Sequence, residues 1–202
     1  MKVLIIGSTG TIGRAVADAL SVRHDVVRVG HSSGDLRVDI TDPASIERLF
    51  KSTGRVDAVV STAGRAHVGP LADMTYEQLR LGADDKLLGQ ISLARLAVDS
   101  VNDGGSITLS SGLASRTHRP GWSVLSAVNA GLEAFVRSAA TEMPRKVRTN
   151  VVSPGVVLES IAALPTPNPF ADAATPVAEI ALAYVRSVEG HDNGCVIDTG
   201  RI

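Results

Sequence analysis

The sequence predicts an α/β fold, a single doubly wound domain with a seven-stranded parallel sheet flanked by helices. Short runs of β-branched residues alternate with longer segments of helical periodicity. The apolar runs VLII, AVV and ITL do not alternate with polar residues, which is typical of strands buried on both faces. The chain has 202 residues, of which 44% are hydrophobic and 20% charged, so we expect one domain over residues 1–202 with a substantial core.

The predicted elements follow in chain order. Strands are predicted over residues 2–6, 25–29, 36–38, 58–61, 106–110, 147–152 and 195–198. Helices are predicted over residues 12–22, 43–51, 76–100, 125–142 and 177–187. Two helices have start signals, because Asp42 precedes Pro43 and Thr175 precedes Pro176. Prolines gather in residues 164–176, which we expect to form a flap or substrate loop.

Charge and cysteine content exclude several classes of protein. Lys and Arg number 20 and Asp and Glu 21, and the net charge of −1 offers no electrostatic footprint for a nucleic acid or an anionic membrane. The only cysteine, Cys195, cannot form an internal disulfide, which favours a reducing, cytoplasmic location, and it leaves no pattern for a metal site. No run of 18 apolar residues occurs, and Met1 and Lys2 lead directly into a predicted strand, so we expect neither a membrane span nor a secretory signal.

A glycine-rich loop between the first predicted strand and the first predicted helix indicates a dinucleotide site. Its three glycines would form a tight turn, let a pyrophosphate approach the backbone and allow close packing of helix on strand. The following helix N-terminus would bind phosphate through free N–H groups. A glycine-rich turn without a ligand is the alternative, but this placement favours a Rossmann-type domain. The loop residues expected at the cofactor are Gly7, Ser8, Thr9, Gly10, Thr11, Ile12 and Gly13.

The end of the second predicted strand favours NADP over NAD. An NAD site places a carboxylate there to hold the ribose diol, but no acid follows Val29 before Asp35. His31, Ser32 and Ser33 could instead receive a 2′-phosphate, with His31 as a cation. An exposed polar turn without this role would have the same composition.

Motifs along nearly the whole chain resemble those of the short-chain dehydrogenase/reductase family. Besides the glycine loop they are VDITD at residues 38–42, STAG at 61–64, LSS at 109–111, NAGL at 129–132, SPG at 153–155 and the segment 194–200. The glycine spacing differs from the commonest form in the family, and STAG stands where relatives usually have Asn-Asn-Ala-Gly. The resemblance implies a nicotinamide cofactor site that also includes Asp39, Ile40, Thr62, Ala63, Gly64, Asn129, Pro154, Gly155 and Val157.

The resemblance implies hydride transfer between the cofactor and a carbonyl or alcohol, but two catalytic positions differ. The family uses a tyrosine acid/base, a lysine four residues later, a serine that polarises the substrate oxygen and an asparagine on the preceding helix. Ser111 matches the serine, whereas Leu125 and Asn129 stand at the tyrosine and lysine positions. Lys86 stands at the asparagine position, so the ammonium and the amide would have exchanged places. Alternatively, Lys86 is a solvated helix lysine and Asn129 a filler.

Nothing equivalent replaces the tyrosine, although a positioned acid or base typically contributes a factor of about 10² to 10⁴ in rate. A serine beside the vacated position, Lys86, or His118 in the loop before the long helix could supply the proton, since histidine exchanges protons near neutral pH. A loop histidine is also commonly just solvated. The candidate catalytic residues are therefore Ser111, Lys86, Asn129 and His118.

Three functions remain open. An NADP(H)-dependent oxidoreductase with a rearranged proton relay, acting on an unknown small molecule, is favoured. The alternatives are a non-catalytic NADP(H)-binding sensor or partner protein and a non-redox isomerase or lyase that uses the same pocket. The long predicted helices carry apolar residues on more than one face, and the family's usual oligomers imply a homodimer or homotetramer.

Overall fold

Seven parallel strands form the central sheet, in the order β3-β2-β1-β4-β5-β6-β9. The structure is a computed structural model that describes residues 1–161 and 173–200. The strands are β1 (Lys2–Ile6), β2 (Asp25–Gly30), β3 (Leu36–Arg37), β4 (Val56–Ser61), β5 (Val101–Ser110), β6 (Arg148–Ser153) and β9 (Val196–Asp198). This confirms the predicted sheet. Its strand order reverses between β1 and β4, where sheets of this kind bind ligands at the carboxyl ends of the strands.

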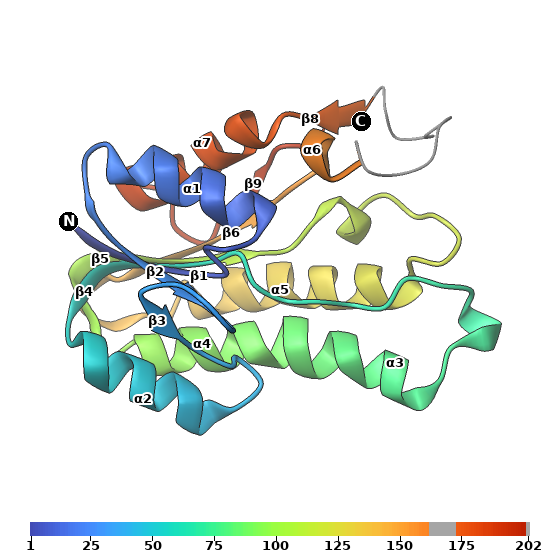
Figure 1. The fold of residues 1–202 in the computed structure, drawn as a ribbon, viewed down its shortest axis with the longest axis horizontal. Helices are drawn as coiled ribbons and strands as arrows, with labels where there is room; N and C mark the ends of the chain where they lie inside the picture. The colour runs from blue at the N-terminus through green and yellow to red at the C-terminus, as the bar shows by residue number, and fades with distance from the viewer. Residues whose placement is uncertain (162–172, 201–202) are drawn as a thin grey trace.

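Helices cover both faces of the sheet, as Figure 1 shows. One face carries α1 (Thr11–Ser21) and α7 (Val177–Glu189), and the other carries α2 (Pro43–Thr53), α4 (Gly89–Ala97) and α5 (Ser123–Ala139). Side chains alternate along a strand. In β1, therefore, Leu4 and Ile6 pack in the core under α2, α4 and α5, whereas Val3 and Ile5 pack under α1 and α7. This two-sided burial explains the continuous apolar runs.

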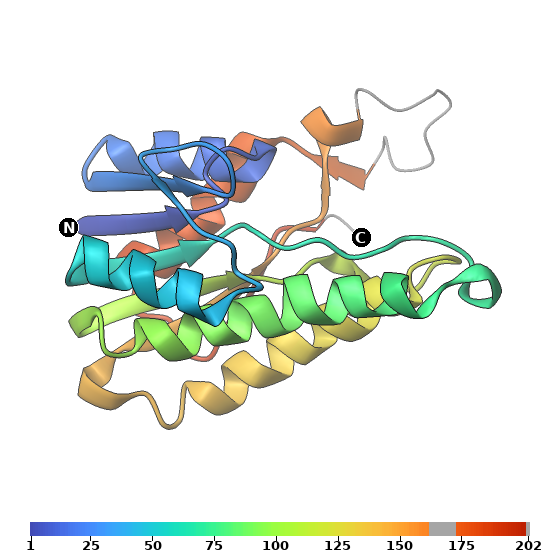
Figure 2. The same cartoon turned by 60° about the horizontal axis from the view of Figure 1, so that its bottom comes forward.

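The helix predicted over residues 76–100 is present from Tyr76 to Ala97, but it consists of three segments with different hydrogen-bonding patterns. Thr75 and Gln78 form a capping box at the start of α3 (Tyr76–Leu81), which is followed by the π-helical segment η2 (Gly82–Leu88) and by α4. The three segments run end to end beside α5 (Figure 2). A Cβ on Gly82 would lie 2.8 Å from Cγ1 of Val124 on α5, so the glycine permits this close approach. Single π turns of this kind occur frequently at functional sites.

The two predicted helix starts have different outcomes. Asp42 caps α2 as predicted, since its side chain accepts a hydrogen bond from the N–H of Ala44. Thr175 does not cap α7, because its hydroxyl donates to the carbonyl of Thr199. The carboxylate of Glu159 instead accepts from the N–H of Val177 at 2.9 Å.

Several short elements complete the described part of the chain. A separate parallel pair joins β7 (Val156–Val157) to β8 (Ala174–Thr175). The short helical segments are η1 (Leu71–Asp73), η3 (Leu113–Ser115), η4 (Pro144–Lys146) and α6 (Leu158–Ile161). Most of the loop predicted over residues 164–176 lies outside the described residues. Within 1–161 and 173–200, no helix has the length and apolar character that crossing a bilayer requires.

Candidate active site

Two adjoining cavities lie at the carboxyl ends of the strands. The glycine-loop cavity, of about 490 Å³, is lined by residues that follow β1, β2 and β4. The Lys86 cavity, of about 280 Å³, is lined by residues from η2, the end of β5, α5 and the segment after β6. Thr62 and Gly64 line both. A ligand that spans the two cavities would therefore pass the loop that follows β4.

The glycine loop has the geometry that its spacing predicts. Gly7 has φ +82°, and a Cβ on Gly13 would lie 2.1 Å from the Gly7 oxygen, so neither position accommodates a side chain. Gly10 caps α1 without a side-chain hydrogen bond, and a Cβ there would meet only the Gly7 oxygen, at 3.4 Å. The first N–H groups of a helix have no partner within it. The loop therefore presents open space and unpaired donors, which suit a phosphate.

Not every predicted loop residue faces a cavity. Gly7, Thr9 and Gly10 line the glycine-loop cavity, and Ile12 lines the Lys86 cavity. The side chain of Ser8 is a correction, because it is 2% exposed and its hydroxyl donates to the carbonyl of Val29 at 3.0 Å. Ser8 therefore stabilises the turn and does not offer its side chain to a ligand.

The outer end of the glycine-loop cavity combines charged and apolar side chains. His31 lines it, with Nε2 3.8 Å from Oδ2 of Asp39. Hydrogen bonds from the hydroxyl and then the N–H of Thr41 lower the pKa of Asp39, and the charges of His31 and Arg65 act in the same direction. Ile40 adds an apolar wall to this end of the cavity.

Two of the predicted phosphate contacts lie apart from this cavity. Ser32 and Ser33 are exposed and are not among its lining residues. Thr11, the first residue of α1, is exposed, whereas Gly13 is buried against the glycine turn. Among the predicted ligands of the 2′-phosphate, the structure therefore brings only His31 to the cavity.

The Lys86 cavity brings together most residues that the sequence predicts at the reacting end. Four of them come from separate elements, which places side chains distant in sequence around one small space. Its lining includes Lys86, Ser111, Leu125, Asn129, Pro154, Gly155 and Val157. Leu125 thus faces the cavity from the tyrosine position, and Lys86 faces it from the asparagine position.

Lys86 is the most perturbed side chain of this cavity. Burial lowers the pKa of its ammonium to about 8, and the charge of Asp85 opposes this only in part. No described residue accepts a hydrogen bond from its Nζ. Gly64, with φ +125°, makes room for the lysine stem, since a Cβ there would lie 3.0 Å from Cα and Cγ of Lys86. Lys86 is therefore half-buried at this cavity, and its catalytic role stays a prediction.

Asn129 offers an unpaired acceptor in the same cavity. It is 1% exposed, and its Oδ1 is buried without a hydrogen-bond partner among the described residues. Such an orphan acceptor costs about 1–3 kcal/mol unless a ligand satisfies it. Asn129 can therefore accept a hydrogen bond from a bound hydroxyl.

Ser111 lines the cavity as predicted, but its hydrogen bond differs from the predicted role. Its hydroxyl donates to Oε1 of Glu133 at 3.0 Å. A hydroxyl has a single hydrogen, so in this arrangement Ser111 cannot also donate to a substrate oxygen. The expectation that Ser111 polarises a carbonyl stays a prediction, and this contact competes with it.

His118 does not join the other candidates. It is exposed, and it is not among the residues that line the Lys86 cavity. The structure gives it no contact with Lys86 or Ser111. His118 therefore has no part in the proton transfer that we propose.

Known proteins give an independent comparison for the family resemblance. Residues 11–181 match the family model described as enoyl-(acyl carrier protein) reductase. The chain belongs to the short-chain dehydrogenase/reductase family. This membership agrees with the strand order, the glycine loop and the position of Ser111.

Curated relatives and solved structures extend this similarity. The chain is 28% identical over 187 residues to carbonyl reductase [NADPH] 2 of Sus scrofa, covering 84% of this chain and 77% of that protein. It is 29% identical over 150 residues to hydroxynaphthalene reductase arp2 of Aspergillus fumigatus, covering 72% of this chain but only 55% of that protein. The crystal structure of lin1944 from Listeria innocua is 39% identical, with a TM-score of 0.95 over 98% of this chain and 99% of that one. A small-chain dehydrogenase in complex with NADPH is 28% identical, with a TM-score of 0.88 over 98% and 96%.

Within this short-chain dehydrogenase/reductase, Gln90 links the two candidate catalytic segments. Its buried side-chain amide donates to the carbonyl of Ser110 and accepts from the N–H of Ser110, both at 2.9 Å. The same Nε2 donates to the carbonyl of Lys86 at 3.3 Å. Gln90 thus ties the helix that carries Lys86 to the strand end that carries Ser111.

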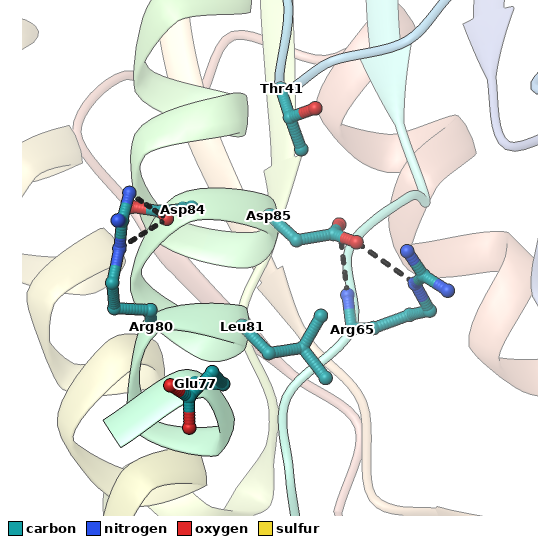
Figure 3. A pocket seen from close by; sticks show the side chains of 7 residues that line it. All are labelled: Thr41, Arg65, Glu77, Arg80, Leu81, Asp84 and Asp85. Carbon is teal, nitrogen blue, oxygen red and sulfur yellow. Dashed lines mark hydrogen bonds and ion pairs between the residues drawn. The ribbon is translucent and has the colours of Figure 1, made fainter. Parts of the chain in front are cut away.

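A third pocket, of about 390 Å³, lies beside η2, and the adjacent acids Asp84 and Asp85 are among its lining residues. Figure 3 shows Asp84 paired with Arg80, and Asp85 paired with Arg65. The two carboxylates bind separate arginines, as their adjacency on a helix predicts. In the described ranges, no cluster of three or more His, Cys, Asp or Glu side chains could hold a metal ion.

Sequence reasoning missed three residues of the site. Trp122 lines the Lys86 cavity, Arg65 lines the glycine-loop cavity, and Glu133 binds Ser111. Glu133 follows Asn129 by four residues, so it lies on the same face of α5. That spacing was the available signal for it.

Proposed function

We propose that this short-chain dehydrogenase/reductase is an NADP(H)-dependent oxidoreductase that reduces a small carbonyl compound, with Lys86 as the proton donor. One observation carries the proposal. Lys86 lines the cavity that Leu125 faces with its side chain half-buried, and no described acceptor takes its hydrogen bonds. An ammonium thus stands in the cavity where the family's tyrosine is missing.

The described residues fit nicotinamide adenine dinucleotide phosphate. The glycine loop and the uncapped start of α1 would hold the pyrophosphate, and the orphan Oδ1 of Asn129 would accept from a ribose hydroxyl. His31 and Arg65 are the basic side chains at the outer end, where a 2′-phosphate would lie. The similar small-chain dehydrogenase was solved with NADPH, and NADPH is printed in the name of the porcine relative. When bound, the nicotinamide supplies a hydride to the carbonyl carbon.

Lys86 suits the second half of such a reduction. The carbonyl oxygen becomes negative as its carbon is reduced, and a nearby ammonium stabilises that charge and donates the proton. A pKa of about 8 leaves most of the Lys86 side chains protonated at neutral pH while keeping transfer accessible. Leu125 keeps one wall of the cavity apolar, which helps to hold this pKa low.

The test replaces Lys86 with methionine, which keeps the length of the stem and removes the proton. We expect Lys86→Met to lower kcat by a factor of about 10² to 10⁴ for whichever aldehyde, ketone or quinone the wild type reduces. NADPH consumption measures kcat, and NADPH fluorescence measures cofactor affinity, which should change less than about threefold. The matched control is Lys51→Met, at an exposed position on α2.

Three outcomes would overturn the proposal. A Lys86→Met variant with wild-type kcat would exclude Lys86 as the donor. Tight NADPH binding by the wild type without turnover of any carbonyl compound would favour a nucleotide-binding sensor. Turnover without a net change in nicotinamide absorbance would favour an isomerase or lyase.

A further inference from the structure

A buried carboxylate lies directly behind Ser111 and has no part in the proposed proton transfer. Glu133, on α5, is 4% exposed. Its Oε1 accepts hydrogen bonds from Ser111 at 3.0 Å and from Ser115 at 2.6 Å. Arg116 lies 3.4 Å from the same oxygen, and Arg137 lies 3.8 Å from Oε2. Two guanidinium groups thus lie beside the carboxylate of Glu133, and a carboxylate can only accept hydrogen bonds.

The contact fixes the polarity of Ser111. The only other acceptor recorded for its hydroxyl is the carbonyl of Val152, at 3.5 Å, so either contact directs the single hydrogen into the protein. Only the lone pairs of Oγ are then available to a ligand in the cavity. Ser111 therefore faces a ligand as a hydrogen-bond acceptor.

The cavity then has one donor and one acceptor for a substrate. Lys86 offers N–H groups to a carbonyl oxygen, and Ser111 accepts from a group that carries a hydrogen. Both line a space of only about 280 Å³, so the two complementary groups of the substrate must lie close together. A carbonyl with a hydroxyl on the neighbouring carbon meets this requirement.

We propose that Glu133 is a positioning residue that holds Ser111 as an acceptor, and that the substrate is a small α-hydroxy carbonyl compound. This inference rests on the proposed function. In the balanced reaction, NADPH gives a hydride to the carbonyl carbon and Lys86 gives a proton to the oxygen. The products are a vicinal diol, NADP⁺ and neutral lysine, which takes a proton back from water. Ser111 only holds the second hydroxyl.

The experiment compares hydroxyacetone with methoxyacetone, which has a methyl group in place of the hydroxyl hydrogen. We expect wild-type kcat/KM to favour hydroxyacetone by at least about tenfold, since a buried acceptor left unpaired costs about 1–3 kcal/mol. Ser111→Ala should reduce the preference to within about threefold. The control is Ser138→Ala, at an exposed serine on α5, the helix that carries Glu133, and it should keep the wild-type preference.

Two variants of Glu133 separate positioning from a merely structural role. Glu133→Gln keeps an acceptor oxygen and should retain the preference. Glu133→Leu leaves the hydroxyl of Ser111 only the long 3.5 Å contact with the Val152 carbonyl, which a substrate oxygen can replace. The preference should then fall while the absolute kcat/KM for methoxyacetone rises. A purely structural residue would lower both values together. If Glu133→Leu does not fold, Ser111→Ala and Glu133→Gln still decide the matter.

The outcomes distinguish this inference from the proposed function. A wild type that reduces both ketones equally, or only ketones that lack a hydroxyl, overturns the inference and leaves the oxidoreductase intact. If nothing turns over, the proposed function fails, and the fluorescence of Trp122 provides a binding test because it is the only tryptophan and lines the cavity. Tighter binding of 1,2-propanediol than of 1-methoxy-2-propanol, lost in Ser111→Ala, would support the acceptor assignment. Equal binding would overturn it.

Discussion

The glycine-loop cavity and the Lys86 cavity meet at Thr62 and Gly64, but they are built in different ways. Backbone forms the first, at glycines where a Cβ would collide with neighbouring atoms. Side chains from four distant segments form the second, among them Lys86, Leu125 and Asn129. The comparison teaches that steric requirements fix residue identity at the phosphate end, whereas the reacting end can redistribute its functional groups.

The pH dependence of turnover gives the largest expected effect and probes the reacting end alone. Because reduction requires protonated Lys86, kcat for reduction should fall about tenfold per pH unit above the pKa of about 8. Alcohol oxidation requires the neutral amine and should rise through the same range. Steady-state rates from pH 6 to 10 measure both directions. A pH-independent reduction would contradict the role of Lys86, and any residual rate of Lys86→Met should lack this dependence.

A matched pair of glycine variants sharpens the comparison at the phosphate end. Gly13→Ala should destabilise the fold by about 3 kcal/mol, because its Cβ would lie 2.1 Å from the Gly7 oxygen and 2.7 Å from Oγ1 of Thr62. Gly10→Ala has room for its Cβ and should change stability by less than about 1 kcal/mol. It should nevertheless weaken NADPH binding at least about tenfold, since the methyl group enters the space for phosphate. Urea denaturation and NADPH titration separate the two effects, and unchanged affinity in Gly10→Ala would argue against a phosphate there.

Lys86 should also carry a cost in stability that the glycine loop does not. Its folded-state pKa lies below the usual lysine value of 10.5, so at pH 7 the charged lysine is penalised in the folded state. Lys86→Met should therefore be more stable than wild type by about 2–3 kcal/mol at pH 7. Between pH 8 and 10.5 the unfolded chain binds more protons, so wild-type stability should rise and the difference should shrink. Equal urea midpoints at pH 7 would contradict this burial.

The smallest expected effect concerns the outer end of the glycine-loop cavity. Replacing His31 with alanine should weaken NADPH binding about three- to tenfold and leave NADH binding unchanged, because its side chain is 79% exposed and contributes one screened contact. Fluorescence titration with both cofactors measures the difference. His191→Ala, at an exposed position far along the chain, serves as the control. Equal losses for both cofactors would exclude a 2′-phosphate contact.

The two cavities also differ in how far the sequence predicts them. Strand positions and the glycine loop could be predicted because local spacing and steric requirements determine them. The lining by Lys86, Leu125 and Asn129 could be predicted only by resemblance, since tertiary contacts bring these residues together.

The remaining differences arise from hydrogen bonds that local patterns do not encode. The π segment Gly82–Leu88 uses residues that suit an ordinary α-helix, so periodicity alone predicts a single helix there. Ser8 follows the loop motif, yet its hydroxyl binds the carbonyl of Val29. Thr175 is of a residue type that commonly caps helices, but its hydroxyl donates to Thr199, and the carboxylate of Glu159 accepts from the first N–H of α7. In each case a distant partner competes with the local preference.

The amide of Gln90 acts as a strut between helix and strand. It pairs with the N–H and the carbonyl of Ser110 and also donates to the carbonyl of Lys86. We therefore expect the helix segment at Lys86 and the end of β5 to move together. The backbone N–H of Ser110 should consequently exchange with deuterium only when the whole domain opens. Because these hydrogen bonds fix the helix of Lys86 against the end of β5, leucine in place of the family's tyrosine need not change the spacing of these two sides of the cavity.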